Sequence, residues 1–235
     1  MAYPKVLVGC PTSDYHRYCW EEYKNSVKSL IYNNFDIVLV DNSKDNDYYK
    51  SLVDDKIKVL RCSYSENPMD RIVRSRNMLR DFALSEGYDY LLSLEQDVIA
   101  PNDILARLMA RKKDIVSGVY FGRYIRNRQK RILPMLWVLR KGDGTKQEYV
   151  PVDTKYINSN KLLKVDICGL GCLLISKKVL EKVKFRYDVS VRKQFDDVYF
   201  CVDAKNNGYQ IYADSSVKCK HLVSQRPWSW NKLLE

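Results

Sequence analysis

Short apolar runs alternate with segments of helical periodicity along the first half of the chain. Apolar runs of the length of a buried strand occupy 5–9, 35–40, 57–62, 88–94 and 114–120. Between them, apolar residues recur at helical spacing and predict helices over 20–31, 69–85 and 102–110. Because strands separated by helices pair in parallel through right-handed crossovers, the pattern predicts a doubly wound α/β sheet.

The second half of the chain is less regular. Strand-like runs at 132–139, 147–152, 162–167 and 172–176 surround glycine-containing turns. Further helices are predicted over 177–183 and from Asp196 to Gly208, where the glycine is placed to act as a C-terminal cap. A short strand at 209–213 follows. No repeat, low-complexity tract or linker composition divides the chain, so we predict one domain over 1–235.

Composition narrows the class of protein. The 46% of hydrophobic residues suffices for a real core, and the net charge of +11 favours anionic partners such as nucleotides, phosphorylated substrates, nucleic acid or an acidic membrane surface. No apolar run approaches the ~20 residues of a membrane span, and 1–5 has no signal-peptide profile. We therefore expect a cytoplasmic protein, with peripheral membrane contact left open.

The seven cysteines lie mostly inside apolar segments, and we interpret them as reduced core residues. Cys168 and Cys172 are four residues apart. A zinc site would need a second pair at ligand spacing, which the sequence lacks.

Two acids end the fourth predicted strand. The apolar run 91–94 stops at Glu95-Gln96-Asp97. Because strand residues alternate sides, Glu95 and Asp97 point the same way. Their mutual repulsion is most simply compensated by a divalent cation with oxygen ligands. The alternative is a solvated loop that leads into an acidic helix cap.

Polar residues also follow the first two strands, at Pro11-Thr12 and at Asp41. Ligands of open parallel sheets bind beyond these carboxyl ends. Asp41 is either an ordinary turn residue or an acceptor for a nucleobase N–H or a ribose hydroxyl. Arg74 and Arg76, on the predicted helix before the fourth strand, either pair with phosphate or lie on an exposed helix face.

A second acidic pair, Asp196-Asp197, begins a predicted helix. One aspartate would serve as a helix cap, which leaves the other to project into a cleft as a general base. His221 lies just beyond the last strand signal, a position at which a lone histidine is usually structural or merely exposed.

Taken in order, these segments resemble the GT-A-fold glycosyltransferases, especially the family-2-type group that uses nucleotide-diphosphate sugars. The resemblance rests on Cys10-Pro11-Thr12, Asp41-Asn42-Ser43, Arg74-Ser75-Arg76-Asn77, Glu95-Gln96-Asp97, the glycine-rich Cys168–Ile175, Asp196-Asp197 and the stretch from Gly208 to His221. Three positions depart from the family pattern. Glu95 replaces the first aspartate of the Asp-x-Asp motif, Asp196 stands where glutamate is usual, and Tyr199 replaces a later aspartate.

The resemblance implies a GT-A, Rossmann-like fold: a mostly parallel central sheet flanked by helices, with a small antiparallel acceptor-side region. It implies a nucleotide-sugar-binding half at 1–121 and an acceptor-binding half with the C-terminal tail at 122–235. The implied reaction moves a hexose-like sugar from a nucleotide-diphosphate sugar to a hydroxyl of a glycan, lipid-linked or protein acceptor. It is expected to invert the anomeric carbon and to need a divalent metal, Mn²⁺ or Mg²⁺.

The resemblance also assigns roles. Asp97 is expected to bind the metal, with Glu95 assisting and His221 as a further ligand. The expected donor contacts are Pro11, Thr12, Asp41, Arg74, Arg76, Glu95 and Gln96. Asp197 is the first candidate for the general base and Asp196 the second.

The roles of a basic segment and of an aromatic segment are left open by the sequence. The segment 123–131 is a solvated mobile loop, a lid over the diphosphate or a contact with anionic lipid. Trp228 and Trp230 are expected to cover an acceptor sugar, touch a membrane interface or contact another subunit.

Three other functions compete. A nucleotidyltransferase of the same fold usually carries a glycine-rich basic loop after the first strand, and 10–15 lacks those glycines. A basic nucleic-acid-binding protein would leave both acidic pairs unexplained, so we expect no nucleic-acid partner. A non-catalytic sugar-binding relative remains open.

Overall fold

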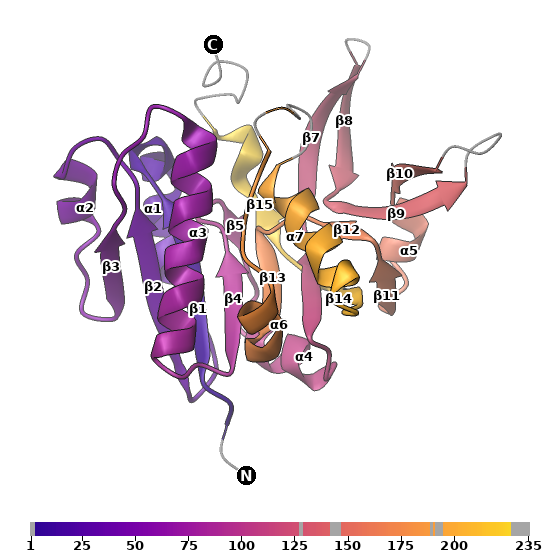
Figure 1. The fold of residues 1–235 in the computed structure, drawn as a ribbon, viewed down its shortest axis with the longest axis horizontal. Helices are drawn as coiled ribbons and strands as arrows, with labels where there is room; N and C mark the ends of the chain where they lie inside the picture. The colour runs from indigo at the N-terminus through magenta and orange to yellow at the C-terminus, as the bar shows by residue number, and fades with distance from the viewer. Residues whose placement is uncertain (1–2, 127–128, 142–146, 189, 191–194, 227–235) are drawn as a thin grey trace.

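The computed structural model describes residues 3–126, 129–141, 147–188, 190 and 195–226. Its centre is an eight-stranded sheet in the order β11-β14-β6-β13-β4-β1-β2-β3 (Figure 1). The strands are β1 (Val6–Thr12), β2 (Phe35–Asp41), β3 (Ile57–Arg61), β4 (Tyr90–Leu94), β6 (Ile115–Val119), β11 (Leu162–Val165), β13 (Cys172–Ser176) and β14 (Ile211–Lys218). Only β13 and β11 run antiparallel to their neighbours in this sheet. The predicted mostly parallel α/β sheet is confirmed.

Helices cover both faces of the sheet. They are α1 (Trp20–Lys28), α2 (Asp47–Ser51), α3 (Pro68–Ser85), α4 (Ile104–Ala110), α5 (Thr154–Ile157), α6 (Lys177–Lys182) and α7 (Asp196–Asn206), with 3₁₀ turns η1 (Asp14–Cys19) and η2 (Leu222–Ser224). Because strand side chains alternate, Leu7 joins one apolar layer with Leu79 of α3, and Val8 joins the other with Tyr23 of α1. The result is a three-layer fold with two cores.

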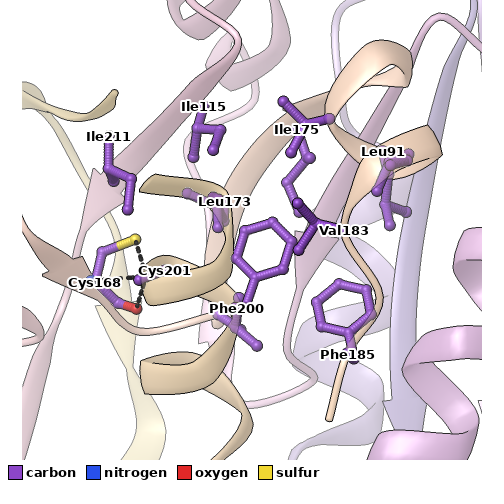
Figure 2. Close-up of a cluster of buried hydrophobic side chains, with 14 of the residues drawn as sticks. Leu91, Ile115, Cys168, Leu173, Ile175, Val183, Phe185, Phe200, Cys201 and Ile211 are labelled. Carbon is purple, nitrogen blue, oxygen red and sulfur yellow. Dashed lines mark hydrogen bonds between the residues drawn. The ribbon is translucent and has the colours of Figure 1, made fainter. Parts of the chain in front are cut away.

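Helix α7 is held against the sheet by aromatic packing. Figure 2 shows Phe200 of α7 beside Phe185, and the two rings stack with centroids 5.0 Å apart. Leu173 and Ile175 of β13 belong to the same cluster. This packing fixes the start of α7, where Asp196 and Asp197 lie, relative to the central sheet.

Smaller sheets complete the second half. They comprise the hairpin β7 (Phe121–Arg126) with β8 (Gln129–Pro134), the sheet β10 (Gln147–Pro151)-β9 (Leu136–Lys141)-β12 (Ile167–Cys168), and the pair β5 (Val98–Ile99) with β15 (Lys220–His221). In Figure 1 the β7–β8 hairpin projects from the body of the molecule. These strands form the antiparallel region that the resemblance implied.

Several element boundaries differ from the prediction. The expected strand 132–139 is divided between β8 and β9, which belong to different sheets. The chain changes partner at this point, since β8 pairs with β7 as far as Pro134 and β9 pairs with β10 and β12. The segment 123–131, expected as a loop, is largely β-hairpin, with 127–128 outside the described residues. Gly208 follows α7 with a φ of 85°, as expected of a C-terminal cap.

Within the described ranges, no helix is long and apolar enough to cross a bilayer. All seven cysteines are buried. Trp228 and Trp230 lie outside the described residues, so their expected contacts stay predictions.

Candidate active site

A cavity of about 340 Å³ lies at the carboxyl ends of β1, β2 and β4. The predicted site residues that line it are Pro11, Thr12, Arg76, Glu95, Gln96, Asp97, Asp196, Asp197 and His221. The acids at 95–97 and 196–197 are therefore brought together in one cavity, although about 100 residues separate them in the sequence.

Arg76 is the centre of a buried ionic cluster. Its Nε donates to Asp196 Oδ2 over 2.6 Å, its Nη2 donates to Glu95 Oε1, and its Nη1 donates to Ser93 Oγ over 3.0 Å. Arg76 is 4% exposed and Asp196 is 2% exposed. Burial opposes the charge of Arg76, but the two carboxylates outweigh it and raise the pKa of the guanidinium above its ordinary value. Asp196 and Arg76 thus compensate each other's buried charge.

Asp197 follows Asp196 but faces the cavity. It lies in the first turn of α7, and its Oδ1 accepts a hydrogen bond from Val198 N–H over 2.8 Å. Desolvation and the neighbouring charge of Asp196 raise the pKa of Asp197 to about 7. A carboxylate with such a pKa can exchange a proton near neutral pH.

Asp97 is a buried carboxylate in the turn between β4 and β5. Its Oδ2 accepts from the Tyr18 hydroxyl over 3.0 Å and from the Arg226 guanidinium, and it lies 3.5 Å from His221 Nε2. Burial would raise the pKa of Asp97, but His221 and the Arg226 charge outweigh it and hold the pKa well below its usual range.

His221 is oriented by the backbone. Pairing of β15 with β5 places it opposite Val98, and its Nδ1 lies 2.7 Å from Phe121 O. That carbonyl can only accept, so Nδ1 carries a proton, and Nε2 is directed at Asp97. Burial would lower the pKa of His221, but Asp97 outweighs it and raises the pKa above its ordinary value.

The pair Asp97 and His221 fits a divalent cation. Asp97 Oδ1 and His221 Nε2 are both buried without a hydrogen-bond partner, and both residues line the cavity. A carboxylate oxygen and an imidazole nitrogen are ligands that Mn²⁺ accepts. Across the described ranges no cluster of three or more His, Cys, Asp or Glu side chains forms a metal site. A cation here would therefore need further ligands from substrate and water.

Gln96, between the two acids, is turned into the protein. It is buried, its Nε2 donates to Tyr48 Oη over 2.8 Å and to His16 O over 3.1 Å, and its Oε1 accepts from Thr12 Oγ1. Thr12 and Gln96, expected to contact the donor, are thus bonded to each other. Together they tie the end of β1 to η1, which carries Tyr18.

Asp41 and Arg74 do not line the cavity. Asp41 is fully buried and is bonded to the Arg61 guanidinium and to Ser43 N–H, the latter over 3.1 Å. Arg74 is half exposed and pairs with Asp70 at 3.7 Å. On α3, Ile72 and Arg76 are four residues apart and share the cavity face, so Arg74 lies on the other side.

Sequence reasoning missed Arg71, Tyr18 and Arg226. Arg71 is buried, lines the cavity and donates to Ser65 O over 2.6 Å. Arg71 and Arg76 are five residues apart, which is not a same-face spacing on a helix, so the sequence pattern did not connect Arg71 with the site. Nothing in the spacing of Tyr18 and Arg226 connects them with Asp97.

Tyr120 explains the glycines of the Cys168–Cys172 segment. Its hydroxyl accepts from Gly171 N–H over 2.8 Å. A Cβ on Gly169 would lie 2.2 Å from that hydroxyl oxygen, and one on Gly171 would lie 2.7 Å from it. Glycine is required at both positions because Tyr120 approaches the backbone so closely.

No protein-family model matches the chain, and no curated protein matches its sequence. Solved structures do match. The chain is similar to A197 from STIV (TM-score 0.50, 19% identity, 94% of this chain and 87% of that one), and to GalNAc-T7 with UDP, GalNAc and Mn²⁺ (0.62, 13%, 93% and 44%). It is also similar to S. aureus TarS 1-349 in complex with UDP-GlcNAc (0.54, 16%, 92% and 58%).

These likenesses establish the fold. The chain has the GT-A fold of the glycosyltransferases GalNAc-T7 and TarS, which confirms the fold that the sequence resemblance implied. It spans about half the length of those two structures, 44% and 58% respectively.

Proposed function

We propose that this protein is a glycosyltransferase that moves a sugar from a nucleotide-diphosphate sugar to a hydroxyl acceptor. The observation that carries the proposal is the meeting of Asp97, His221 and Asp197 at one cavity of a GT-A fold. GalNAc-T7 was solved with UDP, GalNAc and Mn²⁺ and TarS with UDP-GlcNAc, which supports a nucleotide-sugar donor here.

Asp197 is proposed as the general base. The attacking hydroxyl must lose a proton, and a carboxylate with a pKa of about 7 can accept it at neutral pH. Asp196 is the weaker candidate because both its burial and its bond to Arg76 keep it from a substrate. A single base opposite the leaving group supports inversion at the anomeric carbon.

Asp97 and His221 are proposed to hold Mn²⁺ or Mg²⁺. When bound, such an ion stabilises the negative charge that develops on the departing diphosphate. Glu95 bonds to Arg76, so we assign it a positioning role through that pair in addition to any contact with the ion. Glu95 also lies beside the glycine segment at Gly171.

The two ends of the cavity are proposed to bind different parts of the substrates. Pro11 of β1, Asn42 just after β2 and Arg71 of α3 line the cavity from the first half of the chain and suit the nucleoside. Tyr124, Met135 and Phe195 line it from the second half of the chain and suit the acceptor, whether glycan, lipid-linked or protein. The basic β7–β8 hairpin beside them, which includes Arg123, is a candidate contact with an anionic acceptor or membrane surface.

The direct test is a thermal-shift panel of UDP-, GDP-, CDP- and ADP-sugars, each with and without Mn²⁺. A ligand that binds the folded state raises the melting temperature by mass action, so the true donor class should stand out. Incubation of that donor with candidate acceptors, followed by mass spectrometry, should show sugar transfer. Absence of stabilisation by every nucleotide sugar would overturn the proposal. Binding without donor turnover would indicate a non-catalytic sugar-binding protein.

A further inference from the structure

The C-terminal end of the described chain reaches back to the candidate metal site. Arg226 is 129 residues from Asp97 in the sequence, yet its guanidinium donates to Asp97 Oδ2. Asp97 is 1% exposed and the Arg226 side chain is 15% exposed, so their contact is largely shielded from water. A buried carboxylate needs a compensating positive charge, and Arg226 supplies it.

A divalent cation held by Asp97 and His221 would take over that compensation. The cation and the Arg226 guanidinium would then lie beside the same carboxylate, and like charges a few ångströms apart repel strongly in such a shielded site. Both can remain only if a further anion enters. Arg226 itself lines the cavity, so a diphosphate bound there is within the reach of its side chain.

We propose that Arg226 competes with the divalent metal for Asp97 in the donor-free protein and transfers to the donor diphosphate once the metal is bound. The choice of diphosphate as the anion rests on the proposed function, whereas the competition rests on the Asp97–Arg226 contact and on the unpartnered Asp97 Oδ1 and His221 Nε2 in the cavity. Mn²⁺ should therefore bind weakly by itself and more tightly with a nucleoside diphosphate. Because such coupling is reciprocal, Mn²⁺ should strengthen nucleotide binding by the same factor.

The test measures Mn²⁺ affinity directly, by isothermal titration calorimetry and by the electron paramagnetic resonance signal of free Mn²⁺. In the absence of nucleotide, Arg226→Met should bind Mn²⁺ about tenfold more tightly than the unmodified protein, because no guanidinium then competes for Asp97. A tenfold change in affinity corresponds to roughly 1.4 kcal/mol. Arg226→Lys keeps the charge and should stay close to the unmodified protein.

A matched control separates competition at Asp97 from general electrostatics. Arg123 lines the same cavity from β7, and Arg123→Met removes an equal charge without touching the Asp97 contact. It should change Mn²⁺ affinity much less than Arg226→Met does. An equal gain in both variants, or an Arg226→Met protein that binds Mn²⁺ no more tightly than the unmodified one, would overturn the competition. Circular dichroism and the melting temperature verify that each variant is folded.

Titration of Mn²⁺ at saturating UDP, and separately at saturating GDP, tests the second half of the proposal. The factor by which the effective nucleotide tightens Mn²⁺ binding should fall about tenfold in Arg226→Met. An unchanged factor for both nucleotides would refute the transfer to diphosphate. If Arg226→Met gains Mn²⁺ affinity while no sugar is ever transferred, the competition stands and the proposed function fails. If sugar is transferred but Arg226→Met leaves the Mn²⁺ affinity unchanged, the proposed function stands and the competition fails.

Discussion

Arg76 of α3 and Asp196 of α7 form a buried ion pair 2.6 Å long across 120 residues of sequence. The pair joins the first half of the chain to the second. Both Asp196 and Asp197 line the cavity, and because Arg76 occupies Asp196, we expect Asp197 to be the acid that acts on a substrate. The same guanidinium contacts Glu95, so one side chain positions both acidic motifs.

Replacement of Asp197 by asparagine should abolish proton acceptance and preserve the shape of the side chain. We expect sugar transfer to fall at least about 100-fold, the usual contribution of a general base, while donor binding in the thermal-shift assay is kept. Asp203→Asn, on the same helix but in an exposed pair with Arg186, is the control and should transfer normally. Normal transfer by Asp197→Asn would assign the base elsewhere.

The pH dependence of transfer should report the same group. The base must be ionised, and the pKa of Asp197 is raised to about 7, so kcat/KM should rise with pH through about 7 and then level off. The measurement is a rate profile from pH 5 to 9. A profile already flat at pH 5 would show that no group with so raised a pKa acts as the base.

Stability should respond to pH with the opposite sign. The unfolded chain loses the Asp197 proton near the ordinary value, whereas the folded protein keeps it until about 7. Between these values the folded state binds more protons, so this residue makes the free energy of unfolding fall as pH rises. Urea unfolding at pH 5 and pH 8 should show a smaller fall in Asp197→Asn than in the unmodified protein. An identical fall in both would contradict the raised pKa.

Removal of the Arg76 charge should strongly destabilise the fold. Arg76→Met leaves Asp196 and Glu95 without their shared partner in a buried site, and loss of one member of a buried ion pair costs about 3–5 kcal/mol. Arg74→Met, on the same helix but half exposed, should change the free energy of unfolding by less than about 0.5 kcal/mol. Chemical denaturation compares the two, and equal effects would refute the proposed role of the cluster.

The close approach of Tyr120 to the glycine segment can be tested by a double-mutant cycle. Gly169→Ala should cost about 1–3 kcal/mol because the new methyl group meets the Tyr120 hydroxyl. Tyr120→Phe alone should cost about 1 kcal/mol through loss of the bond from Gly171 N–H. The double variant should be more stable than the sum of the two predicts, since the clashing oxygen is gone. Simple additivity would show that the methyl group is accommodated in another way.

The sequence was sufficient for the sheet, whereas the roles of the site residues stay predictions. Strand–helix alternation predicted the α/β sheet, and the polar residues expected after the first and fourth strands, including Thr12 and Glu95, line the cavity. It failed at the β8–β9 boundary, because a continuous apolar run does not reveal a change of sheet. It also could not separate Arg71 from Arg74, since both are charged residues on one helix and only packing decides which faces the cavity.

Local pattern thus determined which elements form, because hydrophobic periodicity and turn chemistry act between residues close in the chain. The tertiary structure alone decided the partners of Asp97, which are Tyr18, His221 and Arg226. It also decided that, of the two cavity-lining aspartates, Asp196 is bonded to Arg76 and Asp197 accepts from Val198 N–H. These contacts depend on how distant elements pack around a shared cavity, and the chain encodes that packing through the whole core rather than through any local spacing.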